Sequence, residues 1–542
     1  MVRGHSYIHM SRATHFQALS QDQTFDLVVV GGGATGLGVA LDAALRGFSV
    51  ALLESHDFGG GTSSRATKLL HGGVRYLAQG NIALVREALA ERSNVLRIAP
   101  HLAQPLPFVM PSYKWWQTPF YGVGLKLYDL MAGRAGLGRT EFLNASETLV
   151  ALPGLKANGL QGGVKYWDGQ FDDARLALAL ARTAEEAGAI VLNYAEVTAL
   201  HPPSTGTGQK GLAQLEVSDR IGKNRCTIKA RCVVNATGVW VDALRNQALG
   251  AAPGATPSHM VSPSQGVHVV VDRDFMPGHH ALLVPKTRDG RVLFAVPWMG
   301  KLILGTTDTP RKDLPREPLA FAEELAFILD EASQVLTRPV RTEDIRSVWV
   351  GLRPLVAPPD NANAGTKSIS REHTIVVDGG NVVTVTGGKW TTYRAMAEDV
   401  LDRCFDEGLL PRRPGSITGR HRLLGAPPSE TPSTPVYAEP GLHLYGTQGH
   451  DVLSCPGAER ELGMGLTEGM VRYAVRHEYA ETVEDVLARR WRSLFLDARQ
   501  AASMAPAVAA LLTEEHGRDP ALAAFLSLCD HYLPPSSKPC EK

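Results

Sequence analysis

The stretch FDLVVVGGGATGLGVALDAALRGFSVALLE, residues 25–54, decides the fold of this chain. Its first six residues are almost entirely apolar, as in a parallel strand that is buried on both faces. Three glycines in G-x-G-x-x-G spacing come next: Gly31, Gly33 and Gly36. A helix-like stretch and a second apolar run over 48–53 follow, and the run ends at Glu54. This order predicts a β-α-β unit with a nucleotide-binding turn.

Each residue of this motif has a physical role in holding a dinucleotide. Gly31 permits the tight turn, Gly33 lets the backbone approach a pyrophosphate, and Gly36 lets helix and strand pack closely. The helix N-terminus then offers free N–H groups and the positive end of its dipole. Glu54 can accept a hydrogen bond from a ribose hydroxyl, and its charge disfavours a 2′-phosphate. The motif therefore favours FAD or NAD over NADP.

Segments far along the chain favour FAD over NAD. A glycine-rich loop carries TSS at 62–64, NATG at 235–238 ends a later strand, and Gly387-Gly388 opens a helix. A helix N-terminus there could place N–H groups against the pyrimidine edge of a flavin. Contacts from segments so distant in sequence suit an extended FAD that lies across the sheet.

Composition limits the class of protein. Among 542 residues, 44% are hydrophobic and 20% charged, and 55 basic residues balance 55 acidic ones. We therefore expect no nucleic-acid partner and no long disordered chain. The six cysteines form no CxxC pair, which argues against a disulfide scaffold or zinc site, so we expect no metal. No apolar run reaches the roughly 18 residues that span a bilayer.

Patterns outside the nucleotide motif indicate further domains. Short alternating strands over 260–310 predict an antiparallel sheet. Residues 411–440 contain seven prolines, which is typical of a linker. Beyond them, 443–530 has helical periodicity, and we expect its Lys and Arg residues to form a solvated face or a subunit contact.

An aromatic and basic stretch over 108–139 has two interpretations. Its aromatic residues could contact lipid headgroups, or they could belong to the core of a domain. Its charges favour an anionic surface, because four cations face a single acid: Lys114, Lys126, Arg134 and Arg139 against Asp129.

Together these segments resemble the FAD-dependent (aerobic, quinone-linked) glycerol-3-phosphate dehydrogenases. The resemblance covers about residues 25–500. The matching segments are VVGGGATGLGVALDAALRG (29–47), TSSRATKLLHGGVRYL (62–77), DDARL (172–176), NATGVWV (235–241), VPWM (296–299), LGTTD (304–308), GLRPL (351–355), GGKWTTYR (387–394) and VRYAVRHEYAETVEDVLARR (471–490).

The resemblance implies an α/β fold with three parts. These are a glutathione-reductase-like FAD-binding Rossmann domain, an antiparallel-sheet substrate domain and an all-helical C-terminal domain. The expected boundaries are a flexible tail (1–22), the FAD-binding domain (23–80, 150–245 and 345–408), the substrate or cap domain (81–149 and 246–344), a Pro-rich linker (409–440), the helical domain (441–532) and a second tail (533–542).

The resemblance also implies a reaction and its partners. The family oxidises sn-glycerol 3-phosphate to dihydroxyacetone phosphate, with FAD taking the hydride and membrane quinone the electrons. We therefore expect a cytoplasmic enzyme attached peripherally to the inner face of the cell membrane, with a homodimer as a further expectation.

The same resemblance suggests which residues serve substrate and cofactor. Arg75 and Arg353 are expected to clamp the phosphate, because a guanidinium binds phosphate bidentately. Lys389 could bind phosphate or flavin. The predicted cofactor contacts beyond Gly31, Gly33, Gly36 and Glu54 are Thr62, Ser63, Ser64, Lys68, His71, Gly72, Ala236, Thr237, Gly238, Gly388, Lys389 and Thr391.

Loss of a hydride from C2 requires a base for the hydroxyl proton. His268 is the first candidate, and His71 and Tyr76 are second. Thr306, Thr307 and Asp308 would shape the site, although Asp308 could instead cap a turn before Pro310. Bacterial relatives often carry Lys at the position of Gln265, so this site is expected to have one positive charge fewer.

Three alternatives share parts of these motifs. A glycerol-3-phosphate oxidase that uses oxygen would share all of them. An amine or 2-hydroxy-acid oxidase would need a carboxylate clamp instead of Arg75 and Arg353. A non-catalytic FAD-binding redox sensor should have lost these two cations, and both are present.

Overall fold

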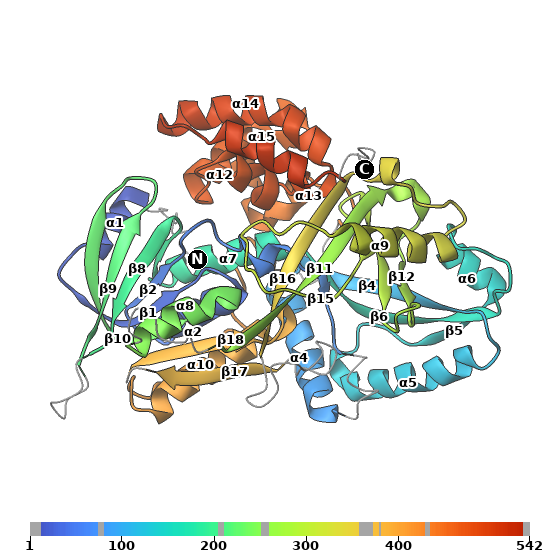
Figure 1. Cartoon of the computed structure of the whole chain (residues 1–542), viewed down its shortest axis with the longest axis horizontal. Helices are drawn as coiled ribbons and strands as arrows, with labels where there is room; N and C mark the ends of the chain where they lie inside the picture. The colour runs from blue at the N-terminus through green and yellow to red at the C-terminus, as the bar shows by residue number, and fades with distance from the viewer. Residues whose placement is uncertain are drawn as a thin grey trace, which may run out of the picture.

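The computed structural model describes residues 12–73, 81–203, 211–250, 259–356, 372–378, 381–428 and 434–534. Two sheets stand side by side, and the C-terminal helices lie across one end of both (Figure 1).

The first sheet contains the β-α-β unit that the glycine motif predicts. Its main path is β17 (His373–Asp378), β18 (Val382–Gly387), β10 (Arg225–Asn235), β1 (Thr24–Val30), β2 (Val50–Leu53) and β7 (Ile190–Leu192). β1 pairs in parallel with both β2 and β10, and β10 pairs in parallel with β18. Two further strands, β8 (Ala195–His201) and β9 (Ala213–Asp219), extend it through β10.

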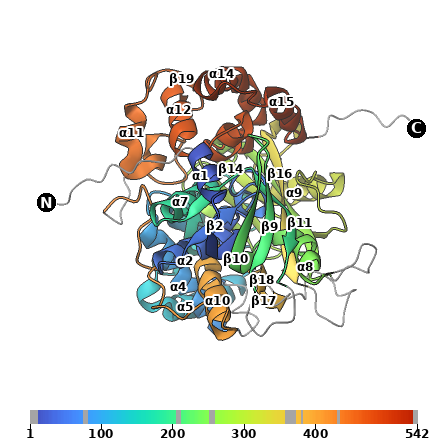
Figure 2. The ribbon, with the colours of Figure 1, turned by 90° about the vertical axis from the view of Figure 1, so that its left-hand side faces the viewer.

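Helices cover both faces of this sheet, which explains its apolar strands. On one face pack α2 (Ala34–Leu45), α7 (Asp173–Glu186) and α10 (Tyr393–Asp406), while α8 (Val241–Ala248) lies on the other (Figure 2). α2 is apolar around nearly its whole circumference, as expected of a helix between a sheet and two other helices.

The second sheet has ten strands and is mainly antiparallel, as predicted for 260–310. Its path is β15 (Thr309–Pro310), β11 (Val261–Asp272), β14 (Lys301–Gly305), β13 (Leu293–Trp298), β12 (Ala281–Val284), β4 (Ala103–Ser112), β6 (Gly162–Phe171) and β3 (Leu69–Leu70). β16 (Ser347–Val356) pairs with β11, and β5 (Glu141–Asn144) pairs with β6. Around it lie α4 (Ile82–Ile98), α5 (Gln117–Ala132), α6 (Ala145–Ala151) and α9 (Ala322–Val335).

Three strands of this second sheet fall in ranges expected to belong to the FAD-binding domain: β3, β6 and β16. The chain crosses between the sheets more often than the expected boundaries allow. Alternation of side chains predicts a strand but does not say which sheet it joins, because partners are chosen by long-range packing.

The C-terminal part is mainly helical, as expected. It contains α11 (Gly449–Leu453), α12 (Glu468–His477), α13 (Ser493–Leu496), α14 (Ala498–His516) and α15 (Leu522–His531). A short hairpin of β19 (Glu461–Gly463) and β20 (Leu466–Thr467) interrupts the helices. A π-helix occupies Asp485–Arg490.

The flexible tail expected over 1–22 is wrong for residues 12–19. They form α1 (Arg12–Leu19), which packs on the first sheet. The imidazole Nδ1 of buried His15 lies 3.1 Å from the carbonyl of Val191, and Arg12 pairs with Asp219 at 2.7 Å. These long-range contacts stabilise a helix whose own pattern is weakly amphipathic. Of the second tail, residues 535–542 lie outside the described residues.

The proline-rich segment 409–440 is packed where it is described. Leu410, Leu423 and Val436 are buried, and the Leu423 N–H donates to the carbonyl of Ile98 over 3.0 Å. Proline fixes φ, so such a segment can lie extended over a surface at a low entropic cost. The described parts therefore behave as a strap across the domains.

Candidate functional site

The glycine turn lies at the carboxyl end of β1 and is too crowded for side chains. Gly31 has φ +112°, and a Cβ on it would stand 2.5 Å from the carbonyl oxygen of Ala236. A Cβ on Gly36 would stand 2.0 Å from the oxygen of Gly31. Gly33 precedes α2, whose first N–H, on Ala34, donates to Ser63 Oγ over 2.9 Å. The turn thus forms an open backbone cradle at a helix N-terminus.

Glu54 closes this cradle from the end of β2. One carboxylate oxygen accepts the N–H of Gly32 at 2.7 Å, and the other accepts the N–H of His56 at 2.8 Å. The oxygen that accepts from His56 also accepts the Ser55 hydroxyl at 3.2 Å, so the second lone pair of the oxygen facing Gly32 is the one that can accept a ribose hydroxyl.

The distant segments meet the cradle at the same edge of the sheet. β10 and β18 run parallel to β1, so NATG and Gly387-Gly388 both follow carboxyl ends. Thr386 Oγ1 donates to the carbonyl of Gly238 over 3.1 Å, and the Trp390 indole N–H donates to that of Ser63 over 2.8 Å. A glycine cradle, an acceptor carboxylate and a glycine turn beyond them fit an extended FAD.

Lys68 differs from its predicted role as a cofactor contact. Its side chain is fully buried, and its ammonium donates to Asp173 at 2.8 Å and to the carbonyl of Ser64 at 2.7 Å. Burial lowers the pKa of Lys68 to about 7, although the carboxylate of Asp173 opposes this. Because its ammonium is consumed inside the protein, Lys68 supports the 62–64 loop from behind.

Two other predicted contacts also serve the fold. Thr62 Oγ1 donates to the carbonyl of Leu352 over 2.6 Å, which ties the loop to β16. Thr391 is 2% exposed and begins the turn into α10. The Thr62 side chain therefore holds its loop in place, and the Thr391 side chain is buried at the start of α10.

His71 and Gly72 lie together on a buried carboxylate that the sequence analysis missed. Asp168 is 1% exposed, accepts the N–H of Gly72 at 3.1 Å, and lies 3.5 Å from His71 Nδ1. Arg92 reaches it at 2.9 Å. Burial opposes ionisation, but His71 and Arg92 outweigh it and hold the pKa of Asp168 below its ordinary value. The sequence signal that could have identified Asp168 is its place as the single acidic residue in the strand GGVKYWDGQF.

Arg353 lies where β16 passes the turn after β14. Its guanidinium contacts Asp308 at 3.1 Å, the carbonyl of Thr307 at 3.0 Å and Thr306 Oγ1 at 3.3 Å. A Cβ on Gly266 would stand 2.2 Å from Arg353 Nη2, so glycine lets the guanidinium cross β11. Asp308 is therefore an ion-pair partner of Arg353, and both of its predicted roles, shaping the site or capping the turn before Pro310, stay predictions. Arg75 and Tyr76 lie outside the described residues.

Gln265 lies in a polar cluster behind this turn. Its amide donates to buried Glu324, which also accepts Thr307 Oγ1 at 2.9 Å, and its oxygen accepts from Arg311. The guanidinium of Arg311 is itself paired with Asp313 at 2.6 Å, so it does not replace the positive charge that was expected to be missing here. Glu324 was not identified from the sequence, because its partners come from β11 and the turn.

His268 is 2% exposed and stacks on Trp349, with ring centroids 5.1 Å apart. Its Nε2 lies 2.9 Å from Thr67 Oγ1. Burial first, and then the charges of Lys68 and Arg353, lower the pKa of His268 well below its ordinary value. A catalytic base works best when its pKa lies near the working pH, so this environment makes His268 a weak base.

Lys389 lines a cavity of about 280 Å³. Gly388, the start of α4 with Glu87, and His373 on β17 line it too. Burial raises the pKa of Glu87. The position suits both roles considered for Lys389, toward a phosphate or toward the flavin.

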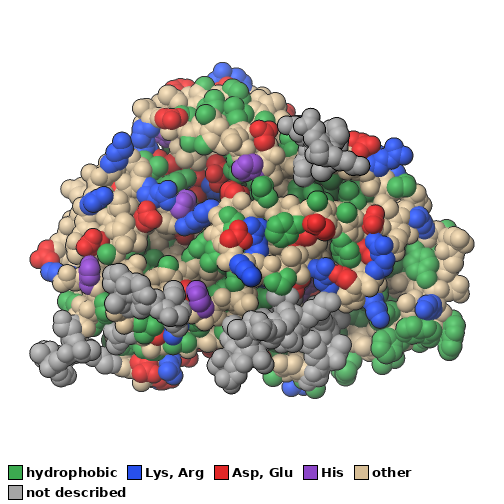
Figure 3. All heavy atoms as spheres, viewed as in Figure 1, with side chains coloured by type: hydrophobic (Ala, Val, Ile, Leu, Met, Phe, Trp, Pro, Cys, Tyr) green, Lys and Arg blue, Asp and Glu red, His purple; other side chains and the backbone are tan. Residues whose placement is uncertain are grey.

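The aromatic stretch is divided between buried and exposed side chains, so the core interpretation holds for part of it and the lipid contact stays a prediction. Leu125 and Tyr128 on α5 are buried, whereas apolar side chains on its other face are exposed. Figure 3 shows hydrophobic side chains gathered at the lower right, over α5. The most exposed are Trp115 (81%), Leu130 (77%), Val123 (69%) and Phe120 (67%). Within the described residues, no helix combines the length and apolar character needed to cross a bilayer.

Comparison with known proteins agrees with this geometry. Residues 26–402 match the FAD dependent oxidoreductase family, and residues 384–523 match the C-terminal domain of alpha-glycerophosphate oxidase. The fold and the site define an FAD-dependent oxidoreductase, and FAD is its cofactor.

The chain is 39% identical to the mitochondrial glycerol-3-phosphate dehydrogenase of Rattus norvegicus, covering 93% of this chain and 72% of the relative. It is 38% identical to that of Arabidopsis thaliana, covering 93% and 84%. The solved glycerol-3-phosphate dehydrogenase of Bacillus halodurans, complexed with FAD, superimposes with a TM-score of 0.75 at 28% identity, covering 97% and 98%. The chain belongs to the FAD-dependent glycerol-3-phosphate dehydrogenase family.

Proposed function

We propose that this protein oxidises sn-glycerol 3-phosphate to dihydroxyacetone phosphate and passes the electrons to a quinone. The observation that carries the proposal is the position of Arg353. It lies between the 62–67 loop of the cofactor cradle and the Thr306–Asp308 turn of the second sheet. FAD, when bound, accepts the hydride.

The protein's own residues bind and orient the substrate. Arg353 offers a fork of N–H donors to the phosphate, held in direction by Asp308 and the Thr307 carbonyl. Lys389 and Arg75 are proposed as further phosphate contacts. The choice of base stays open among His268, His71 and Tyr76, and the burial of His268 favours the other two.

The test is anaerobic mixing of the FAD-loaded protein with sn-glycerol 3-phosphate while the visible flavin absorption is followed. We expect the colour to bleach, and a soluble quinone analogue to restore it much faster than air does. Restoration fastest by oxygen, with peroxide formed, would indicate the oxidase. No bleaching would remove the substrate assignment, and glycerol without phosphate serves as the matched control.

The exposed face of α5 is proposed as a peripheral membrane contact, where a lipid-soluble quinone would be reached. Aromatic side chains beside Lys114 and Lys126 suit an anionic headgroup layer. The cytoplasmic face of the cell membrane and the homodimer stay predictions.

Vesicles of phosphatidylcholine with phosphatidylglycerol test this contact. Replacing Trp115, Phe120 and Leu130 with serine should lower sedimentation with the vesicles about tenfold or more, because buried apolar area drives such binding. Turnover with the soluble quinone analogue should persist. Val150→Ser is the control, since Val150 is 78% exposed but lies on α6. Equal binding by the triple variant and wild type would exclude α5.

A further inference from the structure

The C-terminal domain sends three arginines into its interface with the FAD-binding sheet. Arg489 and Arg490 lie in the π-helix and Arg492 just beyond it, and their side chains are 6%, 3% and 0% exposed. The expectation of a solvated face or subunit contact is wrong for these residues. We call them the arginine clamp.

Two members of the clamp hold Asp57, three residues beyond Glu54. Asp57 is 1% exposed, and both of its carboxylate oxygens accept from Arg490, while one also accepts from Arg489. Asn193, after β7, adds a 3.2 Å bond. Burial opposes ionisation, but the two guanidinium groups outweigh it and hold the pKa of Asp57 below its ordinary value.

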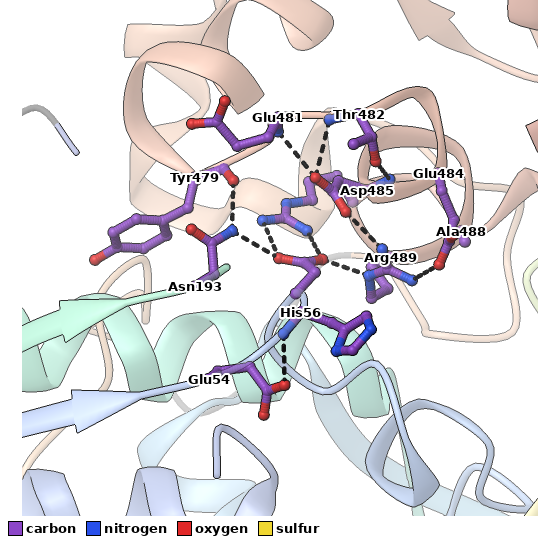
Figure 4. Close-up of polar contacts among 12 residues, drawn as sticks. Glu54, His56, Asn193, Tyr479, Glu481, Thr482, Glu484, Asp485, Ala488 and Arg489 are labelled. Atoms are coloured by element: carbon purple, nitrogen blue, oxygen red, sulfur yellow. Dashed lines mark hydrogen bonds and ion pairs between the residues drawn. The ribbon is translucent and has the colours of Figure 1, made fainter. Parts of the chain in front are cut away.

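Hydrogen bonds with residues of the C-terminal domain and of the first sheet fix the orientation of the clamp side chains. Asp485 accepts from Arg489 at 2.6 Å (Figure 4). It also accepts from the hydroxyl of Tyr194 at 2.8 Å. Arg490 Nε donates to the carbonyl of Glu478 over 3.0 Å. π-helical turns are rare and are often found at functional sites. Here the wider turn directs two successive arginines onto one carboxylate.

The third arginine holds the other cofactor loop. Arg492 donates to the carbonyl of Ser64 at 2.8 Å and pairs with Asp173 at 3.2 Å. Lys68 donates to the same carbonyl, as described above. The neighbouring Ser63 bonds to the start of α2, so this contact lies one residue from the cradle.

Both clamped segments therefore touch the cradle directly. The segment that carries Asp57 begins at Glu54, whose carboxylate accepts the N–H groups of Gly32 and His56, and it returns through Gly59, whose N–H donates to Gly32 over 2.9 Å. A shift of Asp57 would move the ribose acceptor, and a shift of Ser64 would move the partner of α2.

We propose that the arginine clamp makes Arg489, Arg490 and Arg492 positioning residues for FAD, so that the C-terminal domain sets how tightly the cofactor is retained. The proposal rests on FAD binding and not on the proposed substrate, so the two can fail separately.

The experiment follows FAD release from the full-length holoenzyme by the rise in flavin fluorescence after dilution. Arg490→Met should speed release about tenfold or more, as is typical when a group that orients a ligand-binding residue is removed. Tyr194→Phe, which removes one hydroxyl bond to Asp485, should speed it severalfold. The KM for sn-glycerol 3-phosphate at saturating FAD should stay unchanged.

Arg472→Met is the matched control. Arg472 is 9% exposed and, like Arg490, doubly bonded, but its partners Glu514 and Glu515 belong to its own domain. It should lower the melting temperature and leave FAD release at the wild-type rate. If Arg490→Met does not fold, Tyr194→Phe decides alone. Release at the wild-type rate in Tyr194→Phe, or equal acceleration by Arg472→Met, would overturn the proposal.

Discussion

Two places in this molecule use arginine in opposite ways. Arg353, between the two sheets, has a side chain that is 24% exposed and faces Asp308 and neutral oxygens. Arg490, beneath the cofactor cradle, is 3% exposed and uses its N–H groups on Asp57 and the carbonyl of Glu478. One guanidinium is partly exposed beside the carboxylate of Asp308, and the other is buried against its partners inside the fold.

The difference shows what sequence motifs can and cannot say about a cation. Burying a charge is costly unless it is paired and hydrogen-bonded, so a buried arginine is expected to form an ion pair with a carboxylate inside the protein. Both arginines lie in segments typical of the family, GLRPL and VEDVLARR. The two arginines are distinguished by their hydrogen-bond and ion-pair partners. These partners predict different effects on kinetics and FAD release when each arginine is replaced.

The largest expected effect comes from Arg353→Ala. Losing a charge-assisted fork on the phosphate should lower kcat/KM for sn-glycerol 3-phosphate about 10²–10³-fold. FAD release should stay at the wild-type rate, which is the reverse of the pattern expected for Arg490. Steady-state kinetics on the purified holoenzyme check this.

Arg353→Lys is the companion variant, and it should recover part of the loss, because it keeps the charge without the planar fork. Unchanged kcat/KM in Arg353→Ala would place the phosphate elsewhere, and loss of FAD would make Arg353 a structural residue like those of the clamp.

The sequence predicts most of the fold where the determinants are local. The run 25–30, the glycines and Glu54 specify a β-α-β unit within thirty residues, because each step depends on its neighbours in the chain. The assignment of β6 and β16 to the second sheet could not be predicted, since partner choice depends on packing across the molecule. Helix α1 could not be predicted for the same reason, because long-range contacts stabilise it.

The candidate site divides in the same way. The spacing of the motif predicts a tight turn at Gly31 and close packing at Gly36, and the positive φ of Gly31 and the crowding at Gly36 confirm both. The roles of Lys68 and the clamp were not predicted, because a charged residue in a motif does not reveal the carboxylate it meets. Asp57, Asp173 and Glu324 are distant in sequence from their partners.

A smaller effect is expected from Asp308, the carboxylate that holds Arg353. Asp308→Ala removes one of the contacts that direct the guanidinium, so KM should rise about three- to tenfold, in line with one charge-assisted hydrogen bond partly replaced by water. Asp308→Asn keeps an acceptor in place and should change KM less. Equal KM in Asp308→Ala and wild type would show that Thr306 and Thr307 suffice to direct Arg353.

The smallest expected effect is on the pH dependence of stability, through the burial of His101 and the influence of buried Arg175 on its pKa. Burial, and then the charge of Arg175, lower the pKa of His101 to about 3. In the unfolded chain its pKa is about 6.5, so the folded protein disfavours the protonated form. The stability that neutral His101 contributes is complete above pH about 6.5 and is lost as pH falls toward 3.

Between about pH 7.5 and 5.5, wild type should therefore lose about 1.4 kcal/mol more stability than His101→Gln, which has no proton to gain. Thermal melts of the two proteins at both pH values measure the difference, and other titrating groups cancel because both variants share them. Identical pH dependence would mean that the pKa of His101 is not lowered in the folded protein. The charge of Arg175 would then be neutralised by Glu478, 2.7 Å away, and would not affect His101. The interior arginines would then act only on their direct partners, and the contrast with Arg353 would rest on hydrogen bonds alone.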